Sequence, residues 1–390
     1  MRILLTGIDG YIGWPTALRL SKRYPDAEIL GVDNYGRRRW VEEGGAVSAI
    51  PVSSMAERLE AAKKHGFKNI RFQELDLVDR AKVYEVLRTF KPDVILHAAA
   101  QPSAPYSEVS GERANYTQNN NVQGTRNLLW GLKENGLLET LFIETTTTGI
   151  YGAPEFEIPE GYFEVEHKGG RDTLPFPAMA GSWYHMSKAM DALNLWIANR
   201  QWKLTVVDIR TSIIFGAETT ETVLDPKLST RFDFDFDFGV VANRFCVMAL
   251  AGEPITVYGK GEQKKPQLSL EDAVESLVNA VTLPRDKKMT VYNQTAELFS
   301  IVDLANAVKK GAAKLNIHAE IAFIPNPRVE KEEHDMKMAN DRFLKLLNKK
   351  PLRFEDNIIR IMEKLAPFKQ RILDHKHTFI RETKVKAAVK

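Results

Sequence analysis

The sequence has very little cysteine: its 390 residues include one, Cys246. A single cysteine excludes an intramolecular disulfide and a site built from several thiolates, so we expect neither a disulfide framework nor a metal. It also fits a protein that works in a reducing compartment. The fold must therefore rest on a hydrophobic core, and a chain of this length can form a large one.

The chain also lacks a strong excess of charge of one sign and any long apolar run. Its formal net charge is +3 at pH 7, which gives no reason to expect nucleic-acid binding. No apolar run approaches the ~20 residues of a membrane-spanning helix. Strand-forming sequence begins almost at the first residue and leaves no room for a signal or transit peptide, so we predict a cytoplasmic location. Basic residues gather only in residues 366–390, which we expect to form a basic C-terminal tail.

Short apolar runs alternate with amphipathic stretches over residues 1–210. Their positions predict strands at residues 3–6, 28–33, 70–75, 94–97, 141–145 and 204–209, and helices at residues 17–24, 83–90, 121–134 and 184–200. Strands that are apolar throughout fit a parallel sheet with both faces buried. Their alternation with helices predicts the α/β class, with a Rossmann-like, doubly wound parallel sheet.

The pattern loosens after about residue 150, where we expect a smaller α/β lobe that binds the substrate. Residues 153–180 are rich in Pro, Gly and Glu and predict a long ordered loop with a functional role. We assign residues 1–210 to the Rossmann domain, with a return segment near residues 240–290. Residues 211–365 belong mainly to the second lobe, with helices at 243–251, 272–281 and 301–315. In residues 231–238 Phe and Asp alternate, which fits either a half-buried strand or a loop with aromatic anchors.

Three glycines, Gly7, Gly10 and Gly13, follow the first predicted strand and precede the first predicted helix. Glycine is required where the backbone turns tightly and where no side chain can stand between backbone amides and a pyrophosphate. The helix N-terminus adds N–H donors and a partial positive charge for the same anion. This place in the chain predicts a dinucleotide-binding loop, whereas the spacing alone would also fit an ordinary turn.

Acidic residues at strand ends indicate which dinucleotide binds. Asp33 ends the second strand, where a carboxylate accepts hydrogen bonds from ribose hydroxyls and repels a 2′-phosphate, so we predict NAD rather than NADP. The arginines at positions 37–39 favour the opposite choice. Asp76 ends the third strand and can accept from the adenine amino group while Leu77 covers the ring; a plain cap of the strand end is the alternative.

Tyr184 and Lys188 are four residues apart on one predicted helix, so their side chains point the same way. A tyrosine has a pKa near ~10, but a nearby ammonium and a positive nicotinamide ring both favour the phenolate. Tyr184 can then exchange a proton with a sugar hydroxyl while hydride moves to the nicotinamide. Threonines 145–148 end the preceding strand, where a hydroxyl can hold the reacting oxygen, although threonine is also simply a good strand former.

These features together resemble the extended short-chain dehydrogenases that act on nucleotide sugars, and longer segments resemble the UDP-sulfoquinovose synthase family. The segments are Val32-Asp33-Asn34 with Arg37-Arg38, Ser103-Ala104-Pro105-Tyr106-Ser107, Tyr116-Thr117-Gln118 with Asn120-Asn121-Val122, Asp172-Thr173-Leu174-Pro175, Asn243-Arg244-Phe245-Cys246, Thr256-Val257-Tyr258-Gly259-Lys260-Gly261 and Pro325-Asn326-Pro327-Arg328-Val329-Glu330. They extend to about residue 345 and are specific as a set, because a plain epimerase would lack Ser-Ala-Pro-Tyr-Ser and Pro-Asn-Pro-Arg-Val-Glu.

The resemblance implies NAD in the Rossmann lobe and a UDP-sugar under the second lobe. The implied activity is the conversion of UDP-glucose and sulfite into UDP-sulfoquinovose through 4-keto and 4-keto-5-ene intermediates. Thr147 is then the catalytic threonine, and Tyr184 beside Lys188 removes the 4-hydroxyl proton. His185 would move protons in the elimination; packing against the neighbouring loop is its alternative role.

The resemblance also names binding residues and leaves other functions open. Asn34 and Arg37 join the cofactor-binding residues, and Gln101, Thr147, Asn243, Arg244 and Arg328 are the substrate-binding residues, with the arginines suited to the UDP phosphates. The chain departs from the family at Ile150, which replaces a glutamate, and at Pro102, which replaces an arginine. A UDP-sugar 4-epimerase or 4,6-dehydratase is the alternative enzyme, although the Asp-Glu pair of dehydratases is replaced by Thr148-Gly149. A non-catalytic protein that senses NAD is a third hypothesis, and a homodimer through the helix at residues 184–200 is usual for the superfamily.

Overall fold

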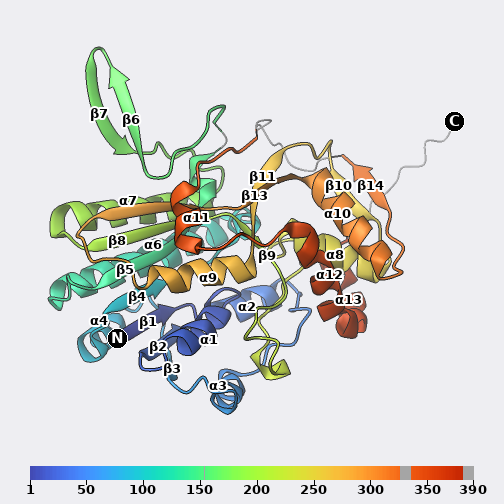
Figure 1. Ribbon diagram of the computed structural model, residues 1–390, viewed down its shortest axis with the longest axis horizontal. Coiled ribbons are helices and arrows are strands. Elements are labelled where there is room, and N and C mark those ends of the chain that lie inside the picture. Colours follow the sequence, from blue (N-terminus) through green and yellow to red (C-terminus); the bar gives the residue numbers. More distant parts are fainter. Residues whose placement is uncertain (153, 326–334, 381–390) are drawn as a thin grey trace.

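A seven-stranded parallel sheet forms the core of the larger lobe, on the left in Figure 1. The computed structural model describes residues 1–152, 154–325 and 335–380. In sheet order the strands are β12 (Met289–Gln294), β8 (Thr205–Thr211), β5 (Leu141–Thr147), β4 (Val94–His97), β1 (Arg2–Thr6), β2 (Glu28–Asp33) and β3 (Ile70–Glu74), and every neighbouring pair is parallel. The predicted doubly wound α/β sheet is confirmed.

Helices cover both faces of this sheet. One layer contains α4 (Arg80–Phe90), α6 (Gly111–Glu134) and α7 (Trp183–Trp202), and the other contains α1 (Gly13–Arg23), α9 (Leu270–Ala280) and α11 (Asp341–Leu347). Alternate residues of β1 connect the two layers: Ile3 and Leu5 are buried in a core with α1 and α9, whereas Leu4 is buried in a core with α4 and α6. Both faces of the strand are thus buried, which explains its unbroken apolar run.

Helix α6 begins at Gly111, not near residue 121 as predicted. Its first turns are polar, and Ser110 caps them by accepting a hydrogen bond from the Arg113 amide at 3.2 Å. A polar side chain of these turns bonds to a neighbouring segment: Gln118 Nε2 donates to the Trp183 backbone oxygen at 2.6 Å. The connections of this half of the chain also contain the short helices α2 (Gly36–Glu43), α3 (Met55–Lys64) and α5 (Ala104–Ser107).

A second lobe packs beside the sheet, as expected. It contains α8 (Val241–Ala251), α10 (Ile301–Lys314), α12 (Phe354–Leu365) and α13 (Lys369–Asp374), a small sheet of β9 (Ile213–Phe215), β11 (Lys264–Ser269) and β13 (Glu297–Ser300), and the pair β10 (Ile255–Tyr258) and β14 (Ile321–Ile324). Phe245 of α8 lies in the core of this lobe. The segment that returns to the Rossmann sheet is therefore α9 to β12, because α8 belongs to the second lobe.

Residues 153–180 are not one long loop. The described part of this segment contains an antiparallel hairpin of β6 (Tyr162–His167) and β7 (Gly170–Pro175) that projects from the body of the molecule (Figure 1). Lys168 and Gly169 join the strands with φ angles of 49° and 79°, as a tight two-residue hairpin turn requires. The alternation in Phe-Glu-Val-Glu before this turn was the strand signal.

Two further segments pack into the core of the second lobe. Residues 231–238 form a loop with aromatic anchors, because Phe232 and Phe234 are fully buried in the core of the second lobe. Ile372 and Phe379 are buried in the same core, so the chain is folded up to residue 380 and the predicted tail from residue 366 is wrong over this stretch. Within the described ranges, no helix combines the length and apolar character needed to cross a bilayer.

Candidate active site

A cavity of about 1240 Å³ lies over the carboxyl ends of the parallel strands. Its wall includes a residue at or just after the end of each of six strands: Gly7, Asp33, Asp76, Ala98, Thr147 and Thr211. Strands β1 and β4 are neighbours in the sheet, and the chain winds away from them in opposite directions, which opens a crevice at this point. The second lobe closes the cavity with Asn243 and Arg244 from α8 and Lys265 from β11.

The three glycines of the loop after β1 pack against each other and line the cavity. Gly7 has a φ of 77°, and a Cβ on it would lie 2.8 Å from the Ala99 amide nitrogen. A Cβ on Gly13 would lie 2.0 Å from the Gly7 carbonyl oxygen. The amide of Gly10 donates to that same carbonyl at 3.1 Å. Only glycine therefore lets the N-terminus of α1 sit this close to the cavity, which is the arrangement that binds a pyrophosphate.

Asp33 lines the cavity beside Asn34 at the end of β2. Its two carboxylate oxygens accept from the backbone amides of Asp9 at 2.9 Å and Tyr35 at 2.8 Å. Burial, with a smaller contribution from the charge of Asp9, raises the pKa of Asp33 to about 6. The carboxylate is thus oriented and still mainly ionised at neutral pH, as a group that accepts from ribose hydroxyls must be.

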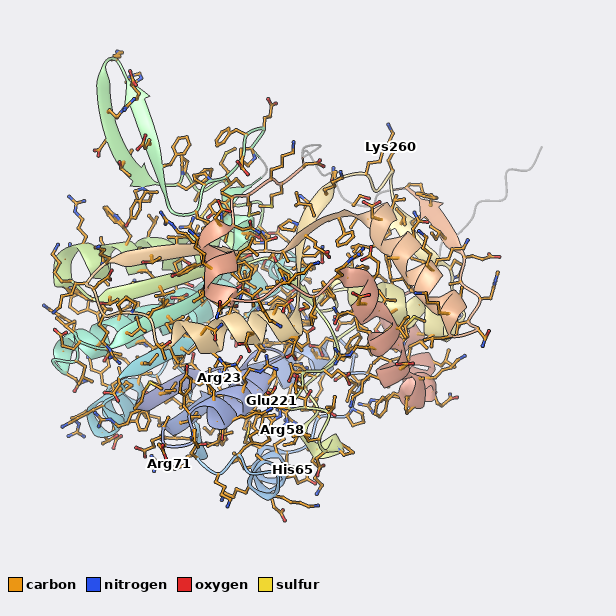
Figure 2. All side chains as sticks on the ribbon, viewed as in Figure 1. Arg23, Arg58, His65, Arg71, Glu221 and Lys260 are labelled. Atoms are coloured by element: carbon orange, nitrogen blue, oxygen red, sulfur yellow. The ribbon has the colours of Figure 1, made fainter. Side chains whose placement is uncertain are left out.

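Arg38 does not project into the ribose site. Its guanidinium makes two hydrogen bonds of 2.7 Å to Asp9 within the glycine loop. Arg58, which reaches Asp9 from α3 at 3.1 Å, is fully buried (Figure 2). Arg38 is therefore part of the support of the glycine loop, not a ready partner for a 2′-phosphate.

Arg37 lines the cavity but is also engaged. Its Nε donates to Asp233 at 2.8 Å, and its guanidinium lies 4.1 Å from the centre of the Phe238 ring. Arg39 donates to the backbone oxygen of Asn34 at 2.5 Å. The arginines that seemed to favour NADP thus have partners in the protein, in agreement with the choice of NAD.

Asp76 and Leu77 also line the cavity, at the far end of the sheet. The Asp76 carboxylate accepts from the Val78 amide at 2.9 Å. This bond is the strand-end cap, and one carboxylate oxygen can cap while the other faces a ligand. A contact with adenine stays a prediction.

Tyr184 and Thr147 meet on the cavity wall near the end of β5. The Tyr184 amide donates to Ser107 Oγ at 3.1 Å, which fixes the start of α7 against α5. Burial raises the pKa of Tyr184, while the Lys188 ammonium and a side-chain hydrogen bond with Thr147 act in the opposite direction. The expected lowering by Lys188 is therefore present but is outweighed by burial in the protein alone.

Lys188 lies behind the cavity wall, because it is not among the described residues that line the cavity. Its ammonium contacts Glu144 Oε1 at 2.7 Å and Asp191 Oδ2 at 2.9 Å, and the side chain is 2% exposed. A helix spacing of four predicted that Lys188 and Tyr184 share a face, and the sign of its effect on Tyr184 agrees with that prediction. The carboxylate partners were not foreseen.

His185 packs beside Tyr184 on the cavity wall, with 5.1 Å between the ring centres. A Cβ on Gly149 would lie 2.3 Å from the His185 ring, so the histidine rests directly on that glycine. Its Nδ1 is 3.0 Å from Ser182 Oγ. Burial and the charge of Lys265 lower the pKa of His185 to about 4, which leaves the imidazole neutral at pH 7. The position of His185 is therefore compatible with both of its predicted roles, packing against the neighbouring loop and contact with the substrate.

The two departures from the family pattern lie in different surroundings. Ile150 is buried in a small core with Tyr151 and Phe176 and is not among the described cavity-lining residues. Pro102 lines the cavity, whereas its neighbour Gln101 is fully buried, with its backbone held by Asn121. Direct substrate contact by Gln101 is therefore corrected: the side chain lies behind the wall that Pro102 forms.

The second lobe contributes polar and basic groups. Asn243 Oδ1 accepts from the Gly216 amide at 3.1 Å, and Arg244 donates to the backbone oxygen of Asp235 at 3.3 Å. Both line the cavity, as does Lys265 from β11. Arg328 and most of its segment lie outside the described residues, so its role stays a prediction.

Sequence reasoning missed Glu144, Asp191 and Lys265. Glu144 was visible in principle, because an acid in the otherwise apolar Leu-Phe-Ile-Glu part of a buried strand needs a partner. Asp191 follows Lys188 by three residues on α7, a spacing that is common on exposed helices and carries little signal. Lys265 reaches the cavity only because β11 pairs with β9 next to it, which no local pattern reveals.

The sequence is similar to those of known proteins. Residues 3–293 match the model of the NAD dependent epimerase/dehydratase family. The chain is 39% identical over 388 residues to a UDP-sulfoquinovose synthase of Sulfolobus acidocaldarius, covering 98% of this chain and 97% of that protein. It is 37% identical to the chloroplastic UDP-sulfoquinovose synthase of Spinacia oleracea, covering 95% of this chain and 77% of the relative.

Solved structures share the fold at lower identity. A UDP-glucose-4-epimerase from Stenotrophomonas maltophila with bound NAD superposes with a TM-score of 0.72 at 17% identity, covering 95% of this chain and 99% of that one. A mutant of the UDP-glucuronic acid 4-epimerase from Bacillus cereus, in complex with UDP-4-deoxy-4-fluoro-glucuronic acid and NAD, gives a TM-score of 0.70 at 19% identity, with coverages of 94% and 99%. The architecture of the two lobes is thus shared.

Proposed function

The chain belongs to the NAD-dependent epimerase/dehydratase family, and within it we propose that it acts as a UDP-sulfoquinovose synthase, which converts UDP-glucose and sulfite into UDP-sulfoquinovose and water. The observation that carries this proposal is one cavity with two chemically different ends. The glycine loop and Asp33 form one end, and Thr147, Tyr184 and His185 lie at the other. The similarity to two synthases extends over at least 95% of this chain and supports the choice of substrate.

The protein residues fit NAD as the cofactor. A Cβ at Gly13 would fill the place where the loop meets α1, and the Asp33 carboxylate is already oriented by two backbone amides. When bound, NAD supplies the hydride acceptor and a positively charged ring near Tyr184. Gly7, Gly10 and Gly13 would hold its pyrophosphate, and Asp33 with Asn34 its ribose.

Tyr184 would remove the 4-hydroxyl proton of the glucose ring, and Thr147 would hold the same oxygen by a hydrogen bond. Oxidation at C4 makes the proton at C5 acidic, because the carbanion formed there is conjugated with the new ketone. Loss of that proton and of the C6 hydroxyl as water yields a 4-keto-5-ene. Sulfite adds at C6, C5 is protonated, and Tyr184 returns its proton to O4 when the ketone is reduced, so the cofactor is unchanged over a full cycle.

His185 is our candidate for proton transfer between C5 and the C6 oxygen. It is a neutral imidazole on the cavity wall, next to Tyr184, and a neutral imidazole can accept a proton on one nitrogen. Ile150 cannot do this work, since it is apolar and buried away from the cavity. The elimination would therefore depend on His185 in this chain.

Basic groups of the second lobe suit the anionic parts of the substrates. Arg244 and Lys265 line the cavity opposite the strand ends, and Asn243 lies next to them. We assign the UDP phosphates to this wall, since guanidinium and ammonium groups form charge-assisted bonds with phosphate oxygens.

The direct test is incubation of the protein with UDP-glucose, sulfite and NAD, followed by mass spectrometry of the UDP-sugar. A product heavier by the sulfonate is expected, and Tyr184→Phe should form none. Release of an epimer or a keto-sugar in place of the sulfonate would assign the chain to the epimerases or dehydratases. Turnover by Tyr184→Phe at the rate of the unchanged protein would refute the catalytic assignment.

We also propose that the protein works as a homodimer in the cytoplasm. Met186, Met190, Leu193 and Ile197 follow each other at helical spacing on α7, and each is between 42% and 51% exposed. Such an apolar stripe marks an interface, and a second copy can pair its own stripe with it in a two-fold arrangement. Leu193→Glu should shift the sedimentation coefficient from that of a dimer to that of a monomer, and an unchanged coefficient would exclude this interface.

A further inference from the structure

A row of polar side chains crosses the interior of the parallel sheet just below the active site. Thr6 of β1 pairs in register with His97 of β4, His97 pairs with Glu144 of β5, and Glu144 pairs with Asp208 of β8. All four are at most 2% exposed. The three residues that precede Thr6, His97 and Glu144 on β1, β4 and β5 are all apolar and buried, as a sheet covered on both faces requires. A row of this kind costs stability, so its members need partners or a function.

Glu144 reaches from this row to the lysine that stands behind Tyr184. Its Oε1 lies 2.7 Å from Lys188 Nζ, and Asp191 contacts the same ammonium at 2.9 Å. The side chains of both acids are fully buried. Glu144 Oε2 and Asp191 Oδ1 have no hydrogen-bond partner among the described residues. Two carboxyl groups thus share one ammonium in a place that water does not reach.

Ionisation of both Glu144 and Asp191 is unfavourable in this buried site. Lys188 and Asp191 face Glu144 from α7, Asp208 faces it from β8, and Thr125 on α6 approaches the same Oε1 at 3.3 Å. Burial is the main cause that raises the pKa of Glu144, to about 8, and Lys188 opposes the rise while Asp191 and Asp208 add to it. His97, the neighbour on β4, has its pKa lowered by burial and by Lys188, so it stays neutral and contributes no compensating charge.

We propose that Glu144 is a positioning residue for the redox step: it holds the Lys188 ammonium behind Tyr184 and controls, through its own charge, how strongly that ammonium stabilises the Tyr184 phenolate. The inference rests on the proposed function, because it concerns the proton that Tyr184 takes from the sugar. With Glu144 protonated, the ammonium is balanced by Asp191 alone and acts on Tyr184. With Glu144 ionised, a second negative charge next to the ammonium cancels this effect, and the phenolate becomes harder to form.

The sign of the pH dependence follows. Glu144 keeps its proton below about pH 8 and loses it above, so the first half-reaction should weaken as the pH rises through that value. One pH unit above this pKa, Glu144 keeps its proton in about one tenth of the molecules. The rate of the first half-reaction should therefore be about tenfold lower there than below the pKa. Glu144→Gln keeps a hydrogen-bond acceptor for Lys188 but cannot ionise, and should be free of this loss.

The experiment uses the reduction of bound NAD by UDP-glucose in the absence of sulfite, followed by NADH absorbance in a stopped-flow instrument. We expect the rate of Glu144→Gln divided by that of the unchanged protein to be near one at about pH 7. The ratio should rise to about tenfold at about pH 9. Taking the ratio removes every ionisation that the two proteins share. A ratio that stays constant over this range overturns the proposal.

Two further variants distinguish the proposed role of Glu144 from a simple loss of stability. Glu221→Gln removes a buried carboxylate from its pair with Arg19, at 2.7 Å, beside α1 and away from α7 (Figure 2). It should lower the melting temperature and leave the pH profile unchanged. Asp191→Asn removes a charge that raises the pKa of Glu144, so the loss of rate should begin at lower pH than in the unchanged protein.

The Asp191→Asn profile keeps the proposal testable if Glu144→Gln fails to fold: an unshifted profile would overturn it. Absence of NAD reduction by the unchanged protein has a different meaning. It would contradict the proposed function, whereas a normal reaction with a pH-independent variant ratio would contradict only the role of Glu144.

Discussion

Replacement of Gly13 by alanine tests whether the loop after β1 is a pyrophosphate site or an ordinary turn. The added Cβ would lie 2.0 Å from the Gly7 carbonyl oxygen and 2.8 Å from its carbon, where ordinary contacts begin at 3.4 Å. Because these atoms are backbone, the loop and the start of α1 must move apart by more than an ångström. Overpacking of this kind costs about 1–3 kcal/mol of folding stability.

The cost to NAD binding should be of similar size to the cost to the fold. Moving the helix start displaces the amides that face the pyrophosphate, and losing one hydrogen bond to a charged group costs about 1.5–3 kcal/mol. This corresponds to a dissociation constant for NAD about ten- to a hundredfold weaker. Isothermal titration calorimetry measures it directly, and thermal unfolding of the same preparation reports the stability.

Gly111→Ala is the matched control, since Gly111 is the first residue of α6 as Gly13 is the first residue of α1. Outside its own helix turn, no described heavy atom lies within 4 Å of a Cβ placed on Gly111. The control should bind NAD normally and gain up to about 1 kcal/mol of stability from the better helix former. Normal NAD binding by Gly13→Ala, or an equal loss in both variants, would refute the assignment of the loop.

Three further predictions concern other parts of the cavity. His185→Gln should stop the reaction at the 4-keto sugar, since proton transfer at C5 is lost while Tyr184 is intact; mass spectrometry that finds sulfonated product at the usual rate would contradict this. Affinity for NAD should weaken as the pH falls through about 6, by up to about tenfold per pH unit, because protonated Asp33 loses its charge and an acceptor for ribose hydroxyls. Calorimetric affinities that do not change between about pH 5 and 7 would exclude that role. Arg244→Gln should raise the KM for UDP-glucose about tenfold with little change in kcat, as expected for a phosphate contact made equally in ground and transition states, and a loss confined to kcat would assign Arg244 to the chemistry instead.

Local patterns were sufficient for the glycine loop and for six of the seven strands of the sheet; the edge strand β12 was not among the predicted strands. The strands β2 and β4 begin and end at the predicted residues, because a strand buried on both faces has an unbroken apolar run with sharp ends. The glycines were readable for a similar reason: each is required by a close approach within its own short segment. The shared position of Tyr184 and Lys188 on α7 could be predicted because the two residues lie four apart on one helix.

Local patterns could not predict contacts between segments that are far apart in the sequence. Arg38 was weighed as a ligand for a 2′-phosphate, but its partner Asp9 lies in the glycine loop, on a different strand–helix unit. The start of α6 was missed because its first turns are polar and bond to a neighbouring segment, so no apolar stripe marks the helix there. Gln101 was assigned to the substrate from a matched segment, yet its position depends on the fold of α6 behind it.

The pairing of Lys188 changes how loss of activity on its replacement should be read. Removing a lysine from between Glu144 and Asp191 would leave two buried carboxyl groups without their cation, and breaking one buried ion pair already costs about 3–5 kcal/mol. An inactive Lys188 variant would thus report destabilisation as much as chemistry. Protonation of Glu144 limits this cost, since a neutral acid can stay buried at a smaller penalty. Protonation of Glu144 lowers the cost of burying this site at neutral pH. It also leaves the Lys188 charge available to Tyr184, so folding and catalysis both favour the protonated form of Glu144.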